Sequence, residues 1–119
     1  MPNVHIEQDG IVRIDYRAYD RVTLSVAQQA YEKQLAVSRD EQRPVLIFGQ
    51  SVMALEDDVA EFVAGNEVKS LTKAAAILTK SFVEEQMGNM YLMFNAPPFP
   101  TRLFTSESVA LRWLTGYVA

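Results

Sequence analysis

The residues that could carry chemistry in this chain are a few carboxylates, one lysine–serine pair and a single histidine. The carboxylates gather at Glu56, Asp57, Asp58 and Glu61, after an apolar run that ends at a glycine. Asp57 and Glu61 are four residues apart, so a helix would place both on one face. Two exposed carboxylates form a weak cation site, because calcium takes roughly six to eight oxygen ligands. A solvated acidic helix face is expected instead, and no metal site is predicted.

Covalent catalysis has no support in the sequence. A nucleophile needs a neighbouring base, whereas the only histidine, His5, lies near the N-terminus and the chain has no cysteine. Glu84 and Glu85 are adjacent and would point about 100° apart around a helix. The five glycines are scattered, which excludes a glycine-rich phosphate loop. The sequence therefore predicts no catalytic residue and no cofactor.

Lys80 and Ser81 are the candidates for an anion site. If the strands are parallel, this pair lies at the carboxyl end of a strand, where ligands of open α/β sheets bind. A helix beginning at Ser81 would also offer its N-terminus to an anion. An enzyme working in this crevice would need a further acid or base, and none is evident. In the alternative interpretation, Ser81 only caps the helix and Lys80 is solvated.

The composition limits the possible partners. The 119 residues fit one domain spanning 1–119, and the net charge of −4 repels phosphate backbones, so no nucleic acid is expected. The N-terminal sequence MPNVHIEQDG has neither the basic nor the apolar part of a secretory signal. The longest clearly apolar runs hold five residues, far short of the roughly 20 that a membrane span needs. We expect a cytoplasmic protein without a membrane span.

Strands and helices alternate along the chain. Asp9-Gly10 is a hairpin-turn signal between two short β-type runs, and Thr23, Ser81 and Ser106 are plausible helix N-caps. The predicted elements are strands at about 4–8 and 11–16, a helix at 23–38, a strand at 45–48, a helix at 55–64, a strand at 74–79, a helix from 81, a strand at 102–104 and a helix from 106. This order predicts an α/β fold with a mixed sheet of about five strands and four helices.

The stretch from Met87 to Pro100 is the most apolar part of the chain outside the strands. Five consecutive large apolar residues go all the way round a helix, so only one face can enter the core. We expect that buried face to carry Val83, Met87, Met90 or Tyr91, and Phe94. The candidates for contact with something else are Met90, Tyr91, Met93 and Phe94. Three roles stay open: core packing against a segment such as Phe99, self-association as a homodimer, or binding of a lipid or other small apolar ligand.

Two segments carry a family resemblance. PTRLFTSESVALRWL, residues 100–114, has a phenylalanine, a Ser/Thr cap, an alanine and a closing Trp-Leu. KAAAILTKS, residues 73–81, reads as a strand entering a helix. The residues in question are Phe104, Thr105, Ser106, Ala110, Trp113 and Leu114. These features resemble the SpoIIAA-like family, within the STAS group of sulfate-transporter and anti-sigma-factor antagonist domains. The resemblance covers about Asp9 to Leu114 and implies a STAS-like domain with a non-catalytic role in bacterial regulation or protein interaction.

The resemblance also bears on a phosphorylation switch. Family members that act as anti-sigma-factor antagonists carry a phosphorylated serine in an Asp-Ser-Ser-Gly type motif, at the start of the helix after the buried strand. Here that position falls on residues 56–59, Glu-Asp-Asp-Val, and Ser51 lies too early. We therefore expect the switch to be missing. Glu56, Asp57, Asp58 and Glu61 become the candidate surface for a protein partner, or acids that only favour the positive end of the helix dipole. A looser resemblance to Sec14-type lipid-binding domains implies the alternative, a carrier of small hydrophobic ligands.

Overall fold

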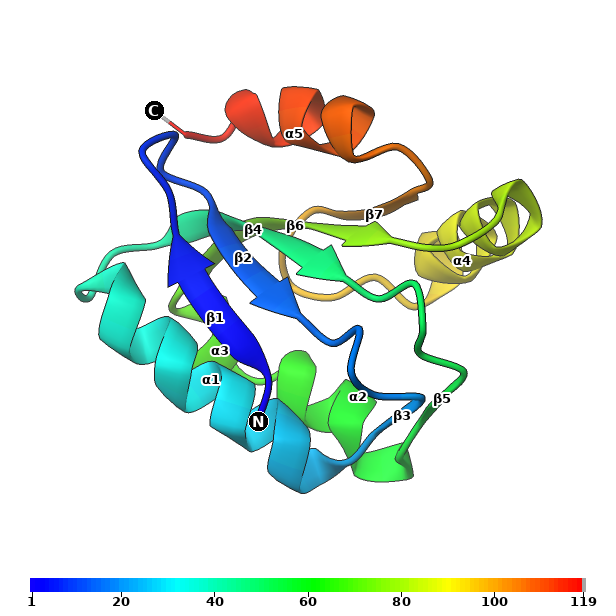
Figure 1. Ribbon diagram of the computed structural model, residues 1–119, viewed down its shortest axis with the longest axis horizontal. Coiled ribbons are helices and arrows are strands. Elements are labelled where there is room, and N and C mark those ends of the chain that lie inside the picture. Colours follow the sequence, from blue (N-terminus) through cyan, green and yellow to red (C-terminus); the bar gives the residue numbers. More distant parts are fainter. Residues whose placement is uncertain (119) are drawn as a thin grey trace.

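Five strands form a mixed sheet through the middle of the computed structural model, which describes residues 1–118 (Figure 1). Their spatial order is β1-β2-β4-β6-β7, with β1 antiparallel to β2 and every other neighbouring pair parallel. The strands span Asn3–Ile6 (β1), Val12–Asp15 (β2), Arg43–Phe48 (β4), Thr72–Leu78 (β6) and Thr101–Phe104 (β7). The predicted hairpin and the predicted mixed sheet of five strands are confirmed.

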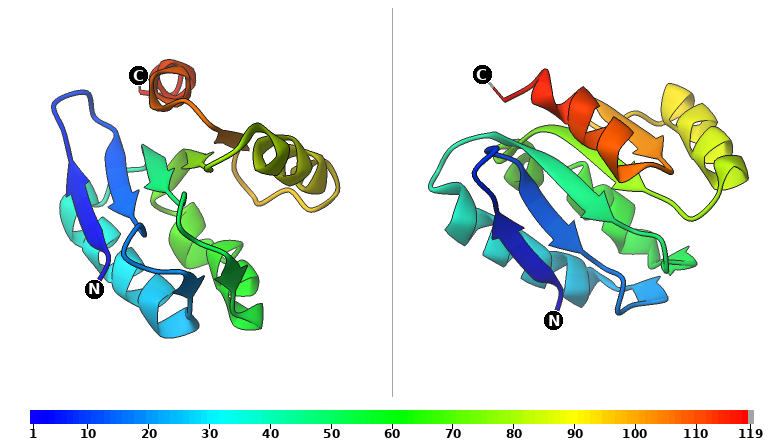
Figure 2. Two further views of the ribbon diagram at one scale, coloured as in Figure 1. Left: turned by 45° about the vertical axis from the view of Figure 1, so that its right-hand side comes forward. Right: turned by 45° about the horizontal axis from the view of Figure 1, so that its top comes forward.

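The helices cover the two faces of the sheet and one of its edges (Figures 1 and 2). They span Leu24–Ser38 (α1), Asp57–Val63 (α2), Asn66–Lys69 (α3), Phe82–Phe94 (α4) and Glu107–Thr115 (α5). α1, α2 and α3 lie on one face and α5 on the other, while α4 lies beyond the outer edge of β7. The predicted N-caps are confirmed, because the side chains of Thr23, Ser81 and Ser106 each accept a hydrogen bond from a backbone N–H three residues later.

Three short elements were not predicted. β3 (Arg21–Val22) and β5 (Ala54–Leu55) pair in parallel as a separate two-stranded sheet, and α3 is a single turn after α2. The second helix therefore begins at Asp57, and the prediction that it begins at about Leu55 is wrong. Leu55 is exposed in β5 rather than part of the helix's apolar stripe. Two-residue strands are too short to show an alternating pattern, so they leave no signal in the sequence.

The apolar core has one layer on each side of the sheet. Under α5 it contains Ile11, Leu46, Phe48, Ala74, Ala76, Leu78, Phe104, Ala110 and Leu114. Under α1 it contains Val12, Ile14, Ala30 and Val45. The small side chains of Ala74 and Ala76 are fully buried, and they allow α5 to approach β6 closely. On α1 the apolar Leu35 is 42% exposed, whereas its polar neighbour Gln34 is buried, with its amide donating to Thr72 Oγ1 at 3.1 Å.

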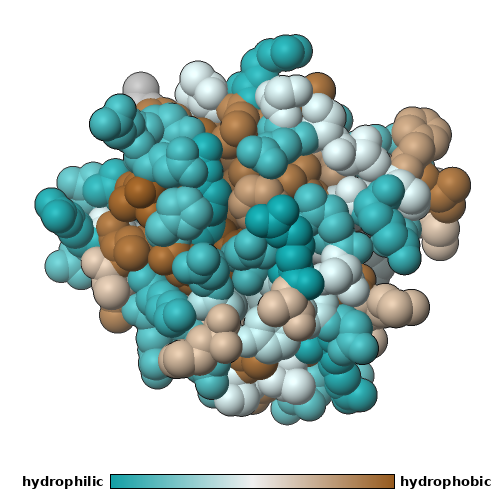
Figure 3. Space-filling view, viewed as in Figure 1, coloured by the Kyte–Doolittle hydropathy of each residue, from teal (hydrophilic) through white to brown (hydrophobic). Residues whose placement is uncertain are grey.

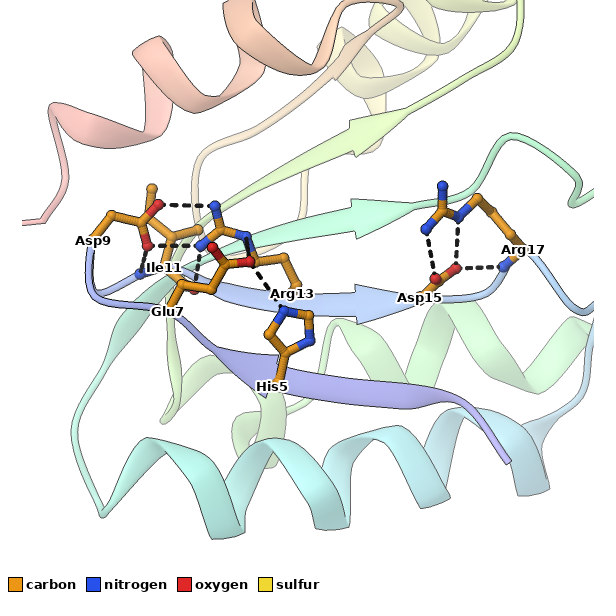
Figure 4. Close-up of polar contacts among 7 residues, drawn as sticks. All are labelled: His5, Glu7, Asp9, Ile11, Arg13, Asp15 and Arg17. Carbon is orange, nitrogen blue, oxygen red and sulfur yellow. Dashed lines mark hydrogen bonds and ion pairs between the residues drawn. The ribbon is translucent and has the colours of Figure 1, made fainter.

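A buried arginine holds the β1–β2 turn (Figure 4). The Arg13 side chain is 7% exposed, and it donates to both carboxylate oxygens of Asp9, at 2.7 and 2.8 Å. It also donates to the carbonyl of Ile11 at 2.9 Å, while Ile11 N donates to Asp9 Oδ1. Such bidentate charge-assisted pairs are strong and directional. The hairpin is therefore fixed by side chains as well as by its backbone ladder.

Replacing the Asp9 carboxylate by an amide should destabilise the fold in a pH-dependent way. Hydrogen bonds from Arg13 hold the pKa of the Asp9 carboxyl below its ordinary value. The pair therefore stabilises the fold above the unfolded pKa, near 3.9, and this contribution is lost as the pH falls through the folded pKa. We expect Asp9→Asn to lower the free energy of unfolding by about 1–2 kcal/mol at pH 7, less than for a fully buried pair because Asp9 is 41% exposed.

Urea unfolding at pH 7 and at pH 3 would test this expectation. The difference between Asp9→Asn and the wild type should shrink at the lower pH. Asp20→Asn, at an exposed carboxylate that forms no ion pair within residues 1–118, should have little effect at either pH. An equal loss of stability at both pH values for Asp9→Asn would contradict the role of the ion pair.

Candidate interaction surface on helix α4

Helix α4 turns its polar side toward the protein. Asn89 meets the outer edge of β7, where Leu103 N donates to Asn89 Oδ1 at 2.8 Å and Asn89 Nδ2 donates to Leu103 O at 3.1 Å. One turn earlier, Glu85 Oε1 accepts a hydrogen bond from Thr105 N at 2.7 Å. These backbone groups lie on the side of β7 away from β6, so the two side chains take the place of another strand. The edge of the sheet is thereby closed.

Gly88 sets the distance between α4 and β7. A Cβ at this position would collide with the side chain of Leu103, whose Cγ would lie only 3.1 Å away. A glycine inside a helix costs about 1 kcal/mol relative to alanine, and here it lets the helix lie directly on the strand. The inward side of α4 is thus formed by Glu85, Gly88, Asn89 and the half-buried Leu92.

The outward side of α4 is apolar. Seven large side chains leave 60–81% of their area exposed: Phe82, Val83, Met87, Met90, Tyr91, Met93 and Phe94. At 100° per residue they span about half of the helix circumference, and the one polar side chain among them is Gln86, which is uncharged. The patch lies over α4 at the right of Figure 3.

The expected burial of α4 is therefore wrong. No residue of this helix is buried, and Val83, Met87, Met90, Tyr91 and Phe94 face outward. The core role proposed for this stretch falls instead to Phe99 in the following loop, which is 8% exposed. The apolar side of α4 faces solvent because Glu85 and Asn89, on the other side of the helix, bind the edge of β7.

The four acidic candidates have different surroundings. Glu56 precedes α2, and its Oε1 accepts a hydrogen bond from Leu24 N at 3.1 Å, which satisfies a free N–H at the start of α1. Asp57 is exposed in the first turn of α2. Asp58 and Glu61 line a shallow hollow of about 380 Å³ between α1 and α2. Glu56 thus links two elements, while the other three carboxylates are exposed.

Comparison with known proteins places this chain in a family. The sequence model of DUF7793, a domain of unknown function, matches residues 4–118. The chain belongs to the DUF7793 family. No curated protein matches it significantly. The DUF7793 chain is similar to a protein of unknown function from Arthrobacter sp. FB24, at 31% identity over 94% of this chain and 97% of that one, with a TM-score of 0.35.

A second solved structure bears on the fold. It is an uncharacterised DUF3478-family protein from Shewanella loihica PV-4, described as having a SpoIIAA-like fold. It matches the DUF7793 chain with a TM-score of 0.63 and 17% identity, over 96% of this chain and 92% of that one. The expected SpoIIAA-like fold is thereby confirmed. This fold is shared with regulatory domains.

Ser51 has a structural contact in this DUF7793 chain. Its hydroxyl lies close to two carbonyl oxygens of the loop after β2, 3.2 Å from Tyr16 O and 2.8 Å from Tyr19 O. It lies in the turn after β4 and not on α2. Residues 56–59, the expected position of a switch motif, do lie at the start of α2, where Glu56 is the N-cap residue.

Lys80 and Ser81, the candidates for an anion site, both contact Glu84 of α4. Ser81 caps α4 by accepting from Glu84 N at 3.2 Å, and Lys80 Nζ lies 4.0 Å from Glu84 Oε2.

Within residues 1–118, no three His, Asp or Glu side chains are grouped so that they could hold a metal ion. In the same range, no helix is both long and apolar enough to cross a membrane.

Sequence reasoning missed Glu85, Gly88 and Asn89. Glu85 was considered only as a possible catalytic acid, and Gly88 only as a scattered glycine. The available signal was their spacing: the three residues fall on one side of α4, opposite the apolar arc. That spacing shows an amphipathic helix, but it does not show which side faces the sheet.

Proposed function

We propose that this DUF7793 chain is a non-catalytic protein-interaction domain that forms a homodimer through the outward apolar side of α4. The observation that carries the proposal is the orientation of this helix, whose polar side faces the sheet and whose apolar side faces solvent. Its polar residues bind the edge of β7, and seven large apolar side chains are left in solvent. Contiguous exposed apolar patches mark contact sites in soluble proteins.

The size of the patch supports a second copy as the partner. Seven side chains with 60–81% of their area exposed present roughly 700–1,000 Å², and a standard interface buries about 800 Å² on each partner. From Met87 to Phe94 the patch contains no charged residue, so these parts of two identical patches related by a two-fold axis would meet without repulsion. Methionine and aromatic side chains also suit an adaptable interface.

The composition of α4 argues against a lipid surface as the partner. Helices that lie on membranes carry lysine and arginine along their polar side. The polar side of α4 carries Glu84, Glu85 and Asn89, and the last two are engaged by β7. A carrier of small apolar ligands, the alternative function, would need a cavity beside α4, where Gly88 and Leu103 are in close contact.

A regulatory role in bacteria is the second part of the proposal. It is supported by the SpoIIAA-like fold, which is shared with regulatory domains. Asp57, Asp58 and Glu61 would form the acidic surface for a different protein partner. Because no serine occupies the start of α2, binding at this surface would not depend on serine phosphorylation there.

Native mass spectrometry of protein purified directly from cells tests the dimer and the alternative together. A species of twice the chain mass with no additional mass is expected. A monomer that retains a ligand of a few hundred daltons would overturn the dimer and support the carrier. A monomer without a ligand would contradict both, and the role of α4 would then require a different protein partner.

A further inference from the structure

The two edge strands of the sheet, β1 and β7, differ in whether their outer backbone groups are bound by other parts of the protein. β7 is closed by Glu85 and Asn89, whereas β1 pairs with β2 alone within residues 1–118. An edge strand presents a row of free N–H and C=O groups, which can pair with another extended chain. The free edge is held in place at both ends. Lys33 Nζ donates to Pro2 O at 2.8 Å before β1, and the Arg13–Asp9 pair fixes the turn after it.

A hollow lies beside the end of this strand. It has a volume of about 430 Å³ and is lined by Ile6 of β1, Ala36 and Val37 of α1, and two arginines, Arg39 and Arg43. Ile6 and Val37 are half-buried and pack against the core layer under α1. The hollow thus has an apolar part formed by the core and two guanidinium groups in its lining.

The two guanidinium groups are not saturated by carboxylates. Within residues 1–118, Arg39 forms no ion pair. Arg43 is 22% exposed, its Nε donates to Ser38 O at 3.2 Å, and its Nη2 lies 3.2 Å from a carboxylate oxygen of Glu41, which is 69% exposed. A carboxylate held this far into solvent adds little and is easily exchanged for another. Arginine also binds carboxylates in a bidentate manner. The chemistry of the hollow therefore favours a carboxylate next to an apolar side chain.

We propose that β1 and this hollow bind an extended acidic peptide segment of a protein partner. The peptide pairs with the free edge of β1 as an additional strand. A side chain opposite Ile6 on the α1 side of the sheet enters the hollow beside Val37. A carboxylate, from a glutamate or aspartate or from the peptide C-terminus, binds Arg39 and Arg43. Strand addition gives such sites their affinity, and the side-chain pocket gives them specificity. The site is on the opposite side of the molecule from α4 (Figure 2), so it does not depend on the proposed dimer.

Backbone amide NMR with three short peptides tests the proposal. Each peptide alternates threonine and valine. One ends in glutamate with an amidated C-terminus, one ends in valine with a free C-terminal carboxylate, and one ends in glutamine with an amidated C-terminus. We expect the amide signals of Asn3–Ile6 and Val37 to shift with at least one of the two carboxylate peptides, and the peptide that binds identifies the source of the carboxylate. The glutamine peptide should bind at least fivefold more weakly.

Arg39→Asn is the matching variant. Arg39 has a φ of 52°, a left-handed conformation that asparagine adopts readily, so the substitution should preserve the turn after α1. It should weaken binding of the carboxylate peptide at least fivefold. Arg112→Asn, which removes an exposed guanidinium from α5 on the other face of the sheet, should leave binding unchanged.

Three results would overturn the proposal. They are no shift in β1 with either carboxylate peptide up to millimolar concentration, equal binding of the glutamine peptide, and equal weakening by Arg39→Asn and Arg112→Asn. A Met90→Glu variant should bind the peptide as the wild type does, whatever its oligomeric state. The proposed peptide site and the proposed α4 dimer are therefore tested independently, and either proposal can be wrong without the other.

Discussion

Met90→Glu should convert the protein from a dimer to a monomer. Met90 is 63% exposed and lies near the middle of the outward arc of α4, about 80° from one end and about 100° from the other. In a two-fold dimer, one glutamate from each copy would enter the uncharged contact, and a charge buried without a partner is strongly unfavourable. We expect the dissociation constant of the dimer to rise roughly 100-fold, which corresponds to about 2.7 kcal/mol. Sedimentation velocity over a range of protein concentrations measures this change directly.

The matched control is Met53→Glu. Met53 is 80% exposed and precedes β5, so the same chemical change is made at an exposed methionine outside α4. It should leave the dimer intact. A Met90→Glu protein that remains dimeric at the same concentrations as the wild type would show that this side of α4 is not the interface. Circular dichroism of both variants should match the wild type, because neither side chain contributes to the core.

Asn89→Ala should open the outer edge of β7. The substitution removes the acceptor of Leu103 N and the donor to Leu103 O. Each hydrogen bond contributes about 1 kcal/mol, and the better helix propensity of alanine returns only about 0.5 kcal/mol or slightly more. We expect a net local loss of about 1.5 kcal/mol, which corresponds to roughly 10-fold faster hydrogen exchange at the Leu103 amide. Exchange measured by NMR at single residues would detect it.

Asn89→Asp is the informative comparison for this contact. An aspartate keeps an oxygen that can accept from Leu103 N, but it cannot donate to Leu103 O. The Leu103 amide should therefore be better protected in Asn89→Asp than in Asn89→Ala. The amide of Thr105, which is bound by Glu85, should change less in both variants. Unchanged exchange at Leu103 in Asn89→Ala would mean that the packing of Gly88 on Leu103 and the Glu85–Thr105 hydrogen bond hold the helix without Asn89.

Most of the secondary structure follows from local features of the sequence. The hairpin signal at Asp9-Gly10 predicts the β1–β2 pair, and the capping side chains Thr23, Ser81 and Ser106 mark the starts of three helices. These signals are readable because each depends on residues within a few positions of one another. The resemblance of residues 73–81 and 100–114 to SpoIIAA-like domains then predicts the arrangement of the sheet, and the similar solved structure with that fold agrees with it.

The candidate surface was only partly predictable. The sequence identified Met90, Tyr91, Met93 and Phe94 as candidates for a contact outside the core, and it showed that α4 is apolar. It also suggested that one apolar side would be buried, because a helix beside a sheet normally packs through its apolar side. That inference depends only on the polarity of the two sides of the helix. It does not include the neighbouring part of the protein, which here is the edge of β7.

Only the tertiary structure decided the orientation of α4. The partners of Asn89 and Glu85 are backbone groups of Leu103 in β7 and of Thr105 just after it, 14 and 20 residues further along the chain. These groups need hydrogen bonds because β7 is the last strand of the sheet. No local pattern in the sequence predicts the order of the strands in the sheet. Gln34 is a similar case, since it is buried by its contact with Thr72, 38 residues away. The sequence alone determined the longer helices and strands and showed that α4 is rich in large apolar residues. The position of α4 at an open sheet edge determined which side faces solvent, because unpaired backbone groups at that edge bind polar side chains rather than apolar ones.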